Sequence, residues 1–162
     1  MTGPGLREPR ERVSPRARAM WRLGALLRSL VVLALVVAAG PVGDLVDVPW
    51  WGYALLGAGL TAYVVVVPQW RYAVHRWEVT DTAVHTQTGW RVRERRIAPM
   101  SRIQTVDHVE GALARLFGLA SVTVTTASAA GALEIAGLDR ARARELVDEL
   151  TLRADAVEGD AT

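Results

Sequence analysis

Arginines alternate along the segment Arg91–Arg96, which reads RVRERR. If this segment is a β-strand, Arg91, Arg93 and Arg95 share one face, because successive side chains point to opposite sides of a strand. Three guanidinium groups in a row suit an anionic surface, either phospholipid head groups or an acidic protein partner. The other interpretation is a solvated strand face, on which Glu94 and acids of neighbouring strands such as Glu78 neutralise the charge. The sequence leaves both interpretations open.

The other polar residues form no catalytic or metal-binding pattern. The histidines are His75, His85 and His108, none of them at metal-ligand spacing from another, and the chain has no cysteine. Every basic residue is an arginine, so mechanisms that need a lysine are excluded. No nucleophile elbow, phosphate-binding loop or glycine-rich dinucleotide turn occurs. We therefore expect a protein that is not an enzyme and that holds no metal or cofactor.

The positive charge is concentrated near the N-terminus. Residues 1–28 carry seven arginines and two glutamates, which gives a net charge of +5. Residues 69–162 carry twelve arginines and thirteen acidic residues, which gives −1. A nearly neutral C-terminal part without a recognisable reading motif argues against binding to nucleic acid.

Two apolar segments predict transmembrane helices within a membrane domain of residues 16–68. Residues 50–67 contain no charge, and as a helix they span roughly 27 Å, close to the thickness of a hydrocarbon core. Residues 23–41 are apolar except for Arg28 and Ser29, and Arg28 lies close enough to the start to extend toward head groups. An alternative for the first segment is a secretory signal cleaved after Ala39. The second segment would still return the chain to the same side.

The arginines predict the orientation of the hairpin. They flank the outer end of both spans, whereas the connector between the spans carries Asp44 and Asp47 and no arginine. The positive-inside rule then puts the N- and C-termini in the cytoplasm of a bacterial cell, with the hairpin in its inner membrane.

After residue 68 the sequence changes to short alternating runs, which predict a mainly β domain over residues 69–153. Val122 and Val124 alternate with Thr123 and Thr125, as in a half-buried strand. A short helix over 112–117 is expected to plug the open end of a barrel with Leu116 and Phe117, and Gly118 suits its left-handed cap. The expected strands are 71–80, 83–88, 90–98, 103–109, 119–126 and 131–137, followed by a helix after Asp139. Residues 1–15 and 154–162 have the composition of disordered tails.

Several sequence blocks of this domain resemble a known family. The blocks are WEVT at 77–80, RRIAPMSRIQTV at 95–106, RLFGLASVTVTT at 115–126 and LEIAGL at 133–138, with Gly89 between the first two. Together they resemble the bacterial pleckstrin-homology (PH) domain of the YdbS type. The positions that carry the structural motif are Trp77, Gly89, Ile103, Leu116, Phe117, Gly118, Val122 and Val124.

The resemblance implies a two-helix transmembrane hairpin followed by a PH-like barrel or sandwich of seven strands with a C-terminal capping helix. It implies a non-catalytic binding or interaction module anchored in the lipid bilayer, working with a larger sibling protein that carries several such modules. The alternative is a regulatory or accessory subunit of a membrane enzyme or transporter complex. Neither the residues nor the resemblance names a ligand or an oligomeric state.

Overall fold

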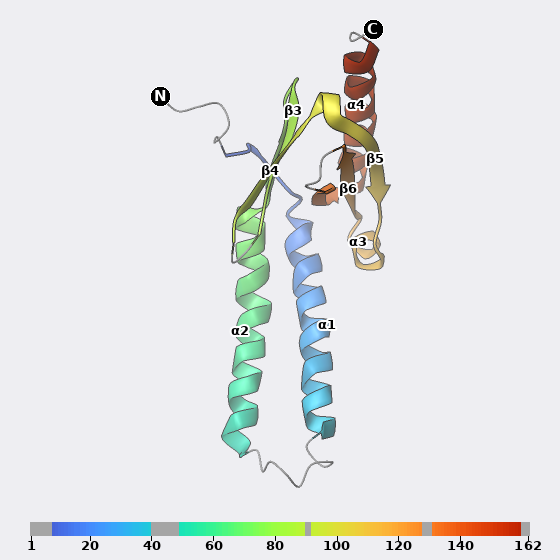
Figure 1. Cartoon of the computed structure of the whole chain (residues 1–162). Helices are drawn as coiled ribbons and strands as arrows, with labels where there is room; N and C mark the ends of the chain where they lie inside the picture. The colour runs from blue at the N-terminus through green and yellow to red at the C-terminus, as the bar shows by residue number, and fades with distance from the viewer. Residues whose placement is uncertain (1–7, 40–48, 90–91, 128–130, 160–162) are drawn as a thin grey trace, which may run out of the picture.

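Two long helices carry a sandwich of two β-sheets at one end (Figure 1). The computed structural model describes residues 8–39, 49–89, 92–127 and 131–159. The helices are α1 (Arg16–Ala39), α2 (Trp50–Val74), α3 (Ala112–Leu116) and α4 (Arg140–Gly159). The strands are β1 (Glu11–Arg12), β2 (Arg76–Val79), β3 (Ala83–Thr88), β4 (Glu94–Pro99), β5 (Ile103–Val109), β6 (Leu119–Thr126) and β7 (Leu133–Asp139). A short 3-10 turn, Met100–Arg102, joins β4 to β5.

The helices α1 and α2 lie side by side and antiparallel, and both are long and apolar enough to cross a membrane. Their mean hydropathies are 2.0 and 1.5, and Leu30, Val31 and Leu35 are exposed along α1, as lipid-facing side chains are. Both helices extend beyond the spans predicted from the sequence. The first begins at Arg16, and the second continues through Pro68 to Val74, so the first part of the strand predicted over 71–80 is helical. A proline removes one helical hydrogen bond, but the helix continues and the ring of Pro68 is buried where the hairpin meets the sandwich.

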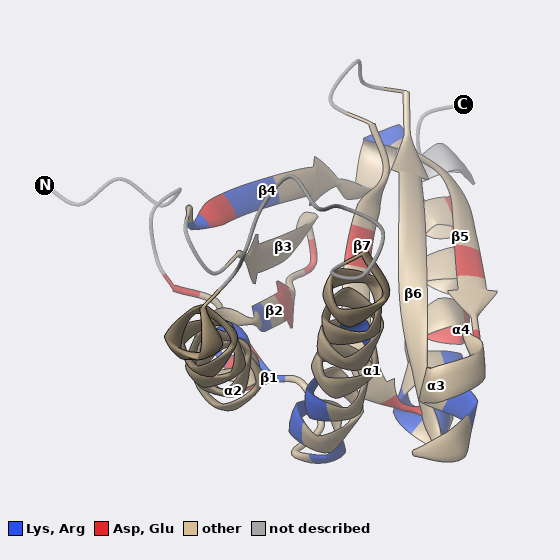
Figure 2. Cartoon of the chain, turned by 90° about the horizontal axis from the view of Figure 1, so that it is seen from below, with Lys and Arg blue, Asp and Glu red and all other residues tan. Residues whose placement is uncertain are grey.

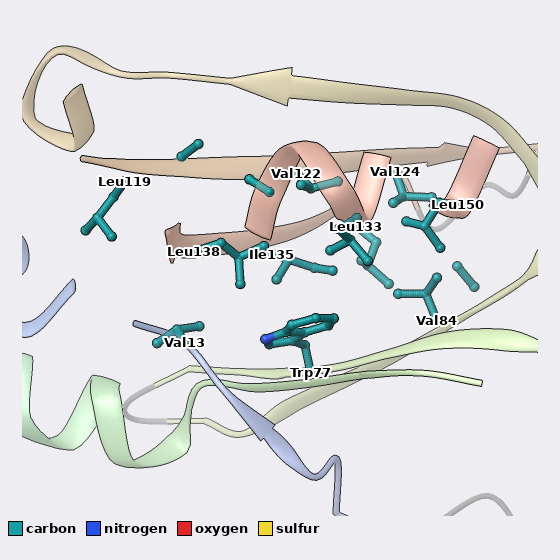
Figure 3. Packing of buried hydrophobic residues seen from close by; sticks show 14 of the residues in the cluster. Val13, Trp77, Val84, Leu119, Val122, Val124, Leu133, Ile135, Leu138 and Leu150 are labelled. Atoms are coloured by element: carbon teal, nitrogen blue, oxygen red, sulfur yellow. The ribbon is translucent and has the colours of Figure 1, made fainter. Parts of the chain in front are cut away.

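The sandwich confirms the predicted fold class. One sheet has the order β1-β2-β3-β4 and the other β5-β6-β7, and all the pairs are antiparallel. Apolar side chains of both sheets face each other in the core, where Trp77 and Val84 of the first sheet lie opposite Val122, Val124 and Ile135 of the second (Figure 3). Strand β6 alternates because its valines face this core and its threonines face outward.

The residues just before the hairpin belong to the sandwich, which corrects the expectation of a disordered tail over 1–15. Strand β1 pairs with β2, with Glu11 opposite Trp77 and Arg12 opposite Arg76. We call residues 8–15 the N-terminal arm. Its Val13 is only 3% exposed, because it fills the core beside Trp77. The hairpin α1–α2 is therefore inserted between the first and second strands of the sandwich, and the chain enters and leaves the hairpin at the same place (Figure 1).

A bulge in β7 receives the arm and the start of α1. The β6–β7 register shifts between Ala120 and Val122, and Gly137 in that stretch has φ = 80°. The Gly137 carbonyl accepts a 2.9 Å hydrogen bond from the Ser14 N–H. The Cβ of Ala17 lies 2.8 Å from the place where a Gly137 side chain would begin. Only glycine suits this position, because it needs both a left-handed backbone and no Cβ.

Helix α4 packs against the sandwich. Its Ala143, Leu146 and Leu150 are buried in the same core as the side chains of the two sheets. The helix continues to Gly159, so the tail expected over 154–162 is helical as far as residue 159. Arg153 holds this end of the helix. Its guanidinium lies 2.9 Å from Glu149 one turn earlier and donates a 3.1 Å hydrogen bond to the carbonyl of Thr80 in the β2–β3 turn.

The predicted motif residues occupy different places in the sandwich. Trp77, Val122 and Val124 are at most 2% exposed, and Ile103 and Phe117 are half-buried against the same core. Gly89 and Gly118 have positive φ. The prediction for Leu116 is wrong: this side chain is 76% exposed. Helix α3 lies beside α1, with Leu113 next to Gly24, rather than across the open end of a barrel (Figure 1).

Candidate functional site

A cavity lies where the hairpin meets the sandwich. It has a volume of about 460 Å³, and we call it the junction cavity. Its walls come from both membrane helices and from strands of both sheets. The lining residues are Trp21, Ala25, Arg28, Tyr63, Val67, Pro68, Arg71, His75, Thr86, Thr88, Gly89, Glu94, Arg96, Ala132, Glu134 and Ala136.

Arg71, in the last turn of α2, forms part of the wall between the two helices. Its guanidinium lies over the ring of Trp21 on α1, 4.5 Å from the ring centroid, which is the geometry of a cation–π contact. The Trp21 ring also packs against the His75 ring, with 5.1 Å between the centroids. Trp21 thus connects α1 to the end of α2 and holds the Arg71 guanidinium at the wall of the cavity.

Arg28 lies on α1 two turns after Trp21, among exposed apolar side chains. Its Nε donates a 3.0 Å hydrogen bond to the carbonyl of Gly24, one turn nearer the sandwich. The side chain therefore extends toward the junction rather than into the apolar region, as an arginine in a membrane helix does when it reaches for the interface. Its guanidinium reaches the same cavity as that of Arg71.

Among the described residues, Arg28 and Arg71 have no carboxylate partner, unlike Arg96 on the opposite wall of the same cavity. No carboxylate among the described residues lies within 4 Å of either guanidinium. Glu134 attracts Arg71 only from a greater distance, and Arg28 repels it. The two positive charges therefore share one cavity without a direct counter-charge.

The opposite wall of the cavity is internally paired. Nε and Nη2 of Arg96 both lie 2.7 Å from Oε1 of Glu94, and Nη1 donates to the carbonyl of Ala132 at 3.0 Å. These contacts tie β4 to the start of β7. In Figure 2, which looks along the hairpin toward the sandwich, the charged residues of β4 lie above the two helices. The charged groups of this wall are therefore bound to each other, whereas Arg28 and Arg71 on the helix wall form no ion pair with a described carboxylate.

His75 follows α2 directly and is buried at 6% exposure. Its Nδ1 lies 3.1 Å from the carbonyl of Arg71, which can only accept, so Nδ1 carries the proton of the neutral ring. Burial, together with the charge of Arg71, lowers the pKa of His75 to about 4. The ring is neutral at pH 7. The ionised lining residues are then three arginines and two glutamates, a net charge of +1.

The predicted arginine stripe is not one strand face. Arg91 lies outside the described residues, and β4 begins at Glu94, so Arg93 precedes the strand and Arg95 lies on it. Arg93 and Arg95 both face Glu8 of the N-terminal arm, with nitrogen–oxygen distances of 3.9 and 3.6 Å. Arg95 also donates a 2.9 Å hydrogen bond to Gln87. The two arginines help to hold the arm, which lies within the tail expected to be disordered over residues 1–15.

The junction cavity was not predicted from the sequence. In the sequence, Arg28 is an arginine inside an apolar span, and Arg71 is one of the arginines that mark the orientation of the hairpin. Nothing in the spacing of residues 28 and 71 shows that they meet, because their distance depends on how the two helices align. The detectable signal was Arg28 itself, since a charge inside a membrane span is costly and often functional.

The described residues contain no group of three or more histidine, aspartate or glutamate side chains that could hold a metal ion. The chemistry that the junction cavity offers is recognition of an anion by guanidinium groups beside apolar and aromatic walls. Arginine suits this chemistry because its planar fork makes two parallel hydrogen bonds to a phosphate or carboxylate.

Comparisons with known proteins agree with the fold. The family described as Bacterial PH domain matches residues 23–154. The chain is 34% identical over 142 residues to the UPF0699 transmembrane protein YdbS of Bacillus subtilis (strain 168). The aligned residues are 83% of this chain and 89% of the relative. No solved structure gives a significant match. The family match includes most of α1, all of α2, strands β2 to β7 and most of α4, so the chain belongs to the bacterial PH domain family and is a transmembrane member of it.

Proposed function

We propose that this protein is a non-catalytic binding module that is fixed at the cytoplasmic face of the bacterial inner membrane and receives its ligand in the junction cavity. The observation that carries the proposal is the insertion of the hairpin between β1 and β2. A module tethered by one flexible linker can turn freely relative to the bilayer. Here two chain crossings and the packed arm hold the sandwich, so the cavity is kept at the level of the membrane surface.

The position of the cavity favours binding over chemistry. Its walls combine paired charges, aromatic rings and two arginines without a direct counter-charge, the features of a recognition site. A volume of about 460 Å³ is within the range of roughly 300–1,000 Å³ that small-molecule sites occupy. The larger sibling with several PH-like modules belongs to this proposal as a partner in the same membrane, and its support is the family resemblance.

Photo-crosslinking tests the binding role of the junction cavity. A photoreactive amino acid replaces Ala132, which is exposed at the cavity rim, and cells are irradiated before the membranes are purified. We expect an adduct of one defined mass, identified by mass spectrometry. The matched control replaces Ala141, an exposed alanine of α4 outside the cavity lining, and is expected to give no such adduct. Equal or absent labelling at both positions would contradict the proposal.

A reporter fusion tests the cytoplasmic orientation. The support for this orientation is the distribution of arginines, which flank the sandwich end of both helices, as the positive-inside rule requires of the cytoplasmic side. A reporter active only in the cytoplasm is expected to be active when fused after Thr162 and silent when inserted at Val46. The reverse pattern would place the sandwich outside the cell.

A further inference from the structure

We propose that Arg28 and Arg71 bind the phosphate of an anionic phospholipid that enters the junction cavity from the bilayer. The inference rests on the proposed function and names the ligand class of the same site. It starts from the two guanidinium groups. Both line one cavity, they carry like charges that repel, and no carboxylate of the described residues lies within 4 Å of either. An anion between them would relieve the repulsion and accept hydrogen bonds from both.

The position of Arg28 indicates a lipid rather than a soluble anion. Leu27, Leu30 and Val31 next to it are 46%, 52% and 59% exposed, so the surface of α1 around this arginine is apolar and faces the acyl chains. A lipid can keep its chains on that surface while its phosphate lies in the cavity. A soluble phosphate would gain only the polar contacts. Basic pockets between membrane helices near the cytoplasmic surface bind anionic head groups in this way.

The remaining walls fit a head group. Trp21 and Tyr63 supply the amphipathic aromatic rings that are favoured at the level of lipid head groups. Glu94 is already paired with Arg96, so it does not neutralise the helix arginines. Glu134 also lines the cavity and attracts Arg71 more strongly than Arg28 repels it, but it lies more than 4 Å from the Arg71 guanidinium and forms no ion pair with it. With His75 neutral, the ionised lining residues sum to +1, which favours a lipid with a net negative charge over a zwitterionic one.

The test measures lipid binding to the full chain in mild detergent by native mass spectrometry. Dioleoyl phosphatidylglycerol is compared with dioleoyl phosphatidylcholine, which has the same acyl chains and no net charge. We expect the wild type to retain phosphatidylglycerol at least tenfold more strongly. Arg28→Gln and Arg71→Gln are each expected to lower that retention about tenfold. Inorganic phosphate at millimolar concentration is the arm for a soluble anion and is expected not to compete.

Arg22→Gln is the matched control, because Arg22 is an exposed arginine of the same helix that does not line the cavity. It is expected to change phosphatidylglycerol retention less than twofold. Arg28→Lys keeps the charge without the planar fork, and we expect it to retain more lipid than Arg28→Gln. Circular dichroism spectra like that of the wild type show that a variant is folded.

The possible outcomes separate this inference from the proposed function. If folded Arg28→Gln and Arg71→Gln bind phosphatidylglycerol like the wild type, or if all three glutamine variants lose it equally, the inference is wrong. Competition by inorganic phosphate would also overturn the lipid assignment. If the crosslinker at position 132 captures a partner protein, and lipid binding does not depend on Arg28 and Arg71, the proposed function stands. The assignment of a phospholipid as the ligand is then wrong.

Discussion

Replacing Gly137 with alanine is expected to lower the free energy of unfolding of the sandwich by about 2–5 kcal/mol. A left-handed backbone conformation costs an L-residue roughly 1–2 kcal/mol, and Gly137 has φ = 80°. The new Cβ would also lie 2.8 Å from the Cβ of Ala17 and 3.5 Å from the Trp21 ring. Overpacking of this kind adds roughly 1–3 kcal/mol. The measurement is urea unfolding of the full chain in mild detergent.

Gly131→Ala is the matched control for this substitution. Gly131 has nearly the same backbone conformation, with φ = 77°, but its new Cβ would meet nothing within 4 Å. It is expected to cost only the conformational part, about 1–2 kcal/mol. The difference between the two variants therefore measures how tightly the start of α1 packs on β7. Equal losses of stability in the two variants would mean that this contact contributes nothing.

Acidification is expected to destabilise the sandwich through His75. The pKa of His75 is about 4 in the folded protein and near 6.5 when the chain is unfolded. Between these values the unfolded chain binds more protons, so stability is complete above about pH 6.5 and falls as the pH drops toward 4. At about 1.4 kcal/mol for each pKa unit, the loss from pH 7 to pH 4 attributable to this residue is about 3 kcal/mol.

Urea unfolding of the wild type and of His75→Asn across this pH range isolates the contribution of His75. Asparagine can donate to the Arg71 carbonyl but does not titrate, so the carboxylates that also titrate near pH 4 affect both proteins alike. The wild type is expected to lose about 3 kcal/mol more than the variant. Parallel pH profiles would show that His75 is not buried in its neutral form.

Much of the sandwich could be predicted from the sequence because its strands obey simple local rules. The alternation of valine and threonine in β6 reflects a strand with one face in the core, and β3 and β5 keep their predicted bounds. The alternation in β5 is imperfect because its register with β6 shifts between Ile103 and Thr105. Each of these features depends on neighbouring residues, so a window of a few residues contains the signal.

The errors concern features that depend on contacts between distant residues. Strand β1 has only two residues, both charged, and shows no periodicity. Its partner strand β2 lies on the far side of the hairpin in the sequence, so no local pattern indicates the pairing. The C-terminal helix continues to Gly159, and its Arg153 donates a hydrogen bond to the distant Thr80 carbonyl. Leu116 has the spacing of a core residue, but α3 packs beside α1, and the helical pattern alone cannot tell which surface is covered.

The candidate site shows the same limit more strongly. Arg28 and Arg71 are 43 positions apart, and they share a cavity only because α1 and α2 pair with Trp21 beside Arg71. Arg93 and Arg95 form a conspicuous pattern in the sequence, yet both meet Glu8 of the arm. The arginines that stand out in the sequence are paired with a carboxylate, whereas Arg28 and Arg71, which do not stand out, line the cavity.

The most direct test of the central claim, that the segment before the hairpin is a strand of the sandwich, is a cross-strand disulfide. The chain has no cysteine, so an engineered pair is free of background. Residues 12 and 76 are register partners in β1 and β2, and opposite residues of antiparallel strands lie roughly 4.5–5.5 Å apart at Cα, within the range of a disulfide. The double variant Arg12→Cys and Arg76→Cys is expected to form an intramolecular disulfide on mild oxidation in native membranes, whereas Arg12→Cys with Arg144→Cys on α4 is not. Absence of the first disulfide, or equal formation of both, would contradict the insertion of the hairpin between β1 and β2.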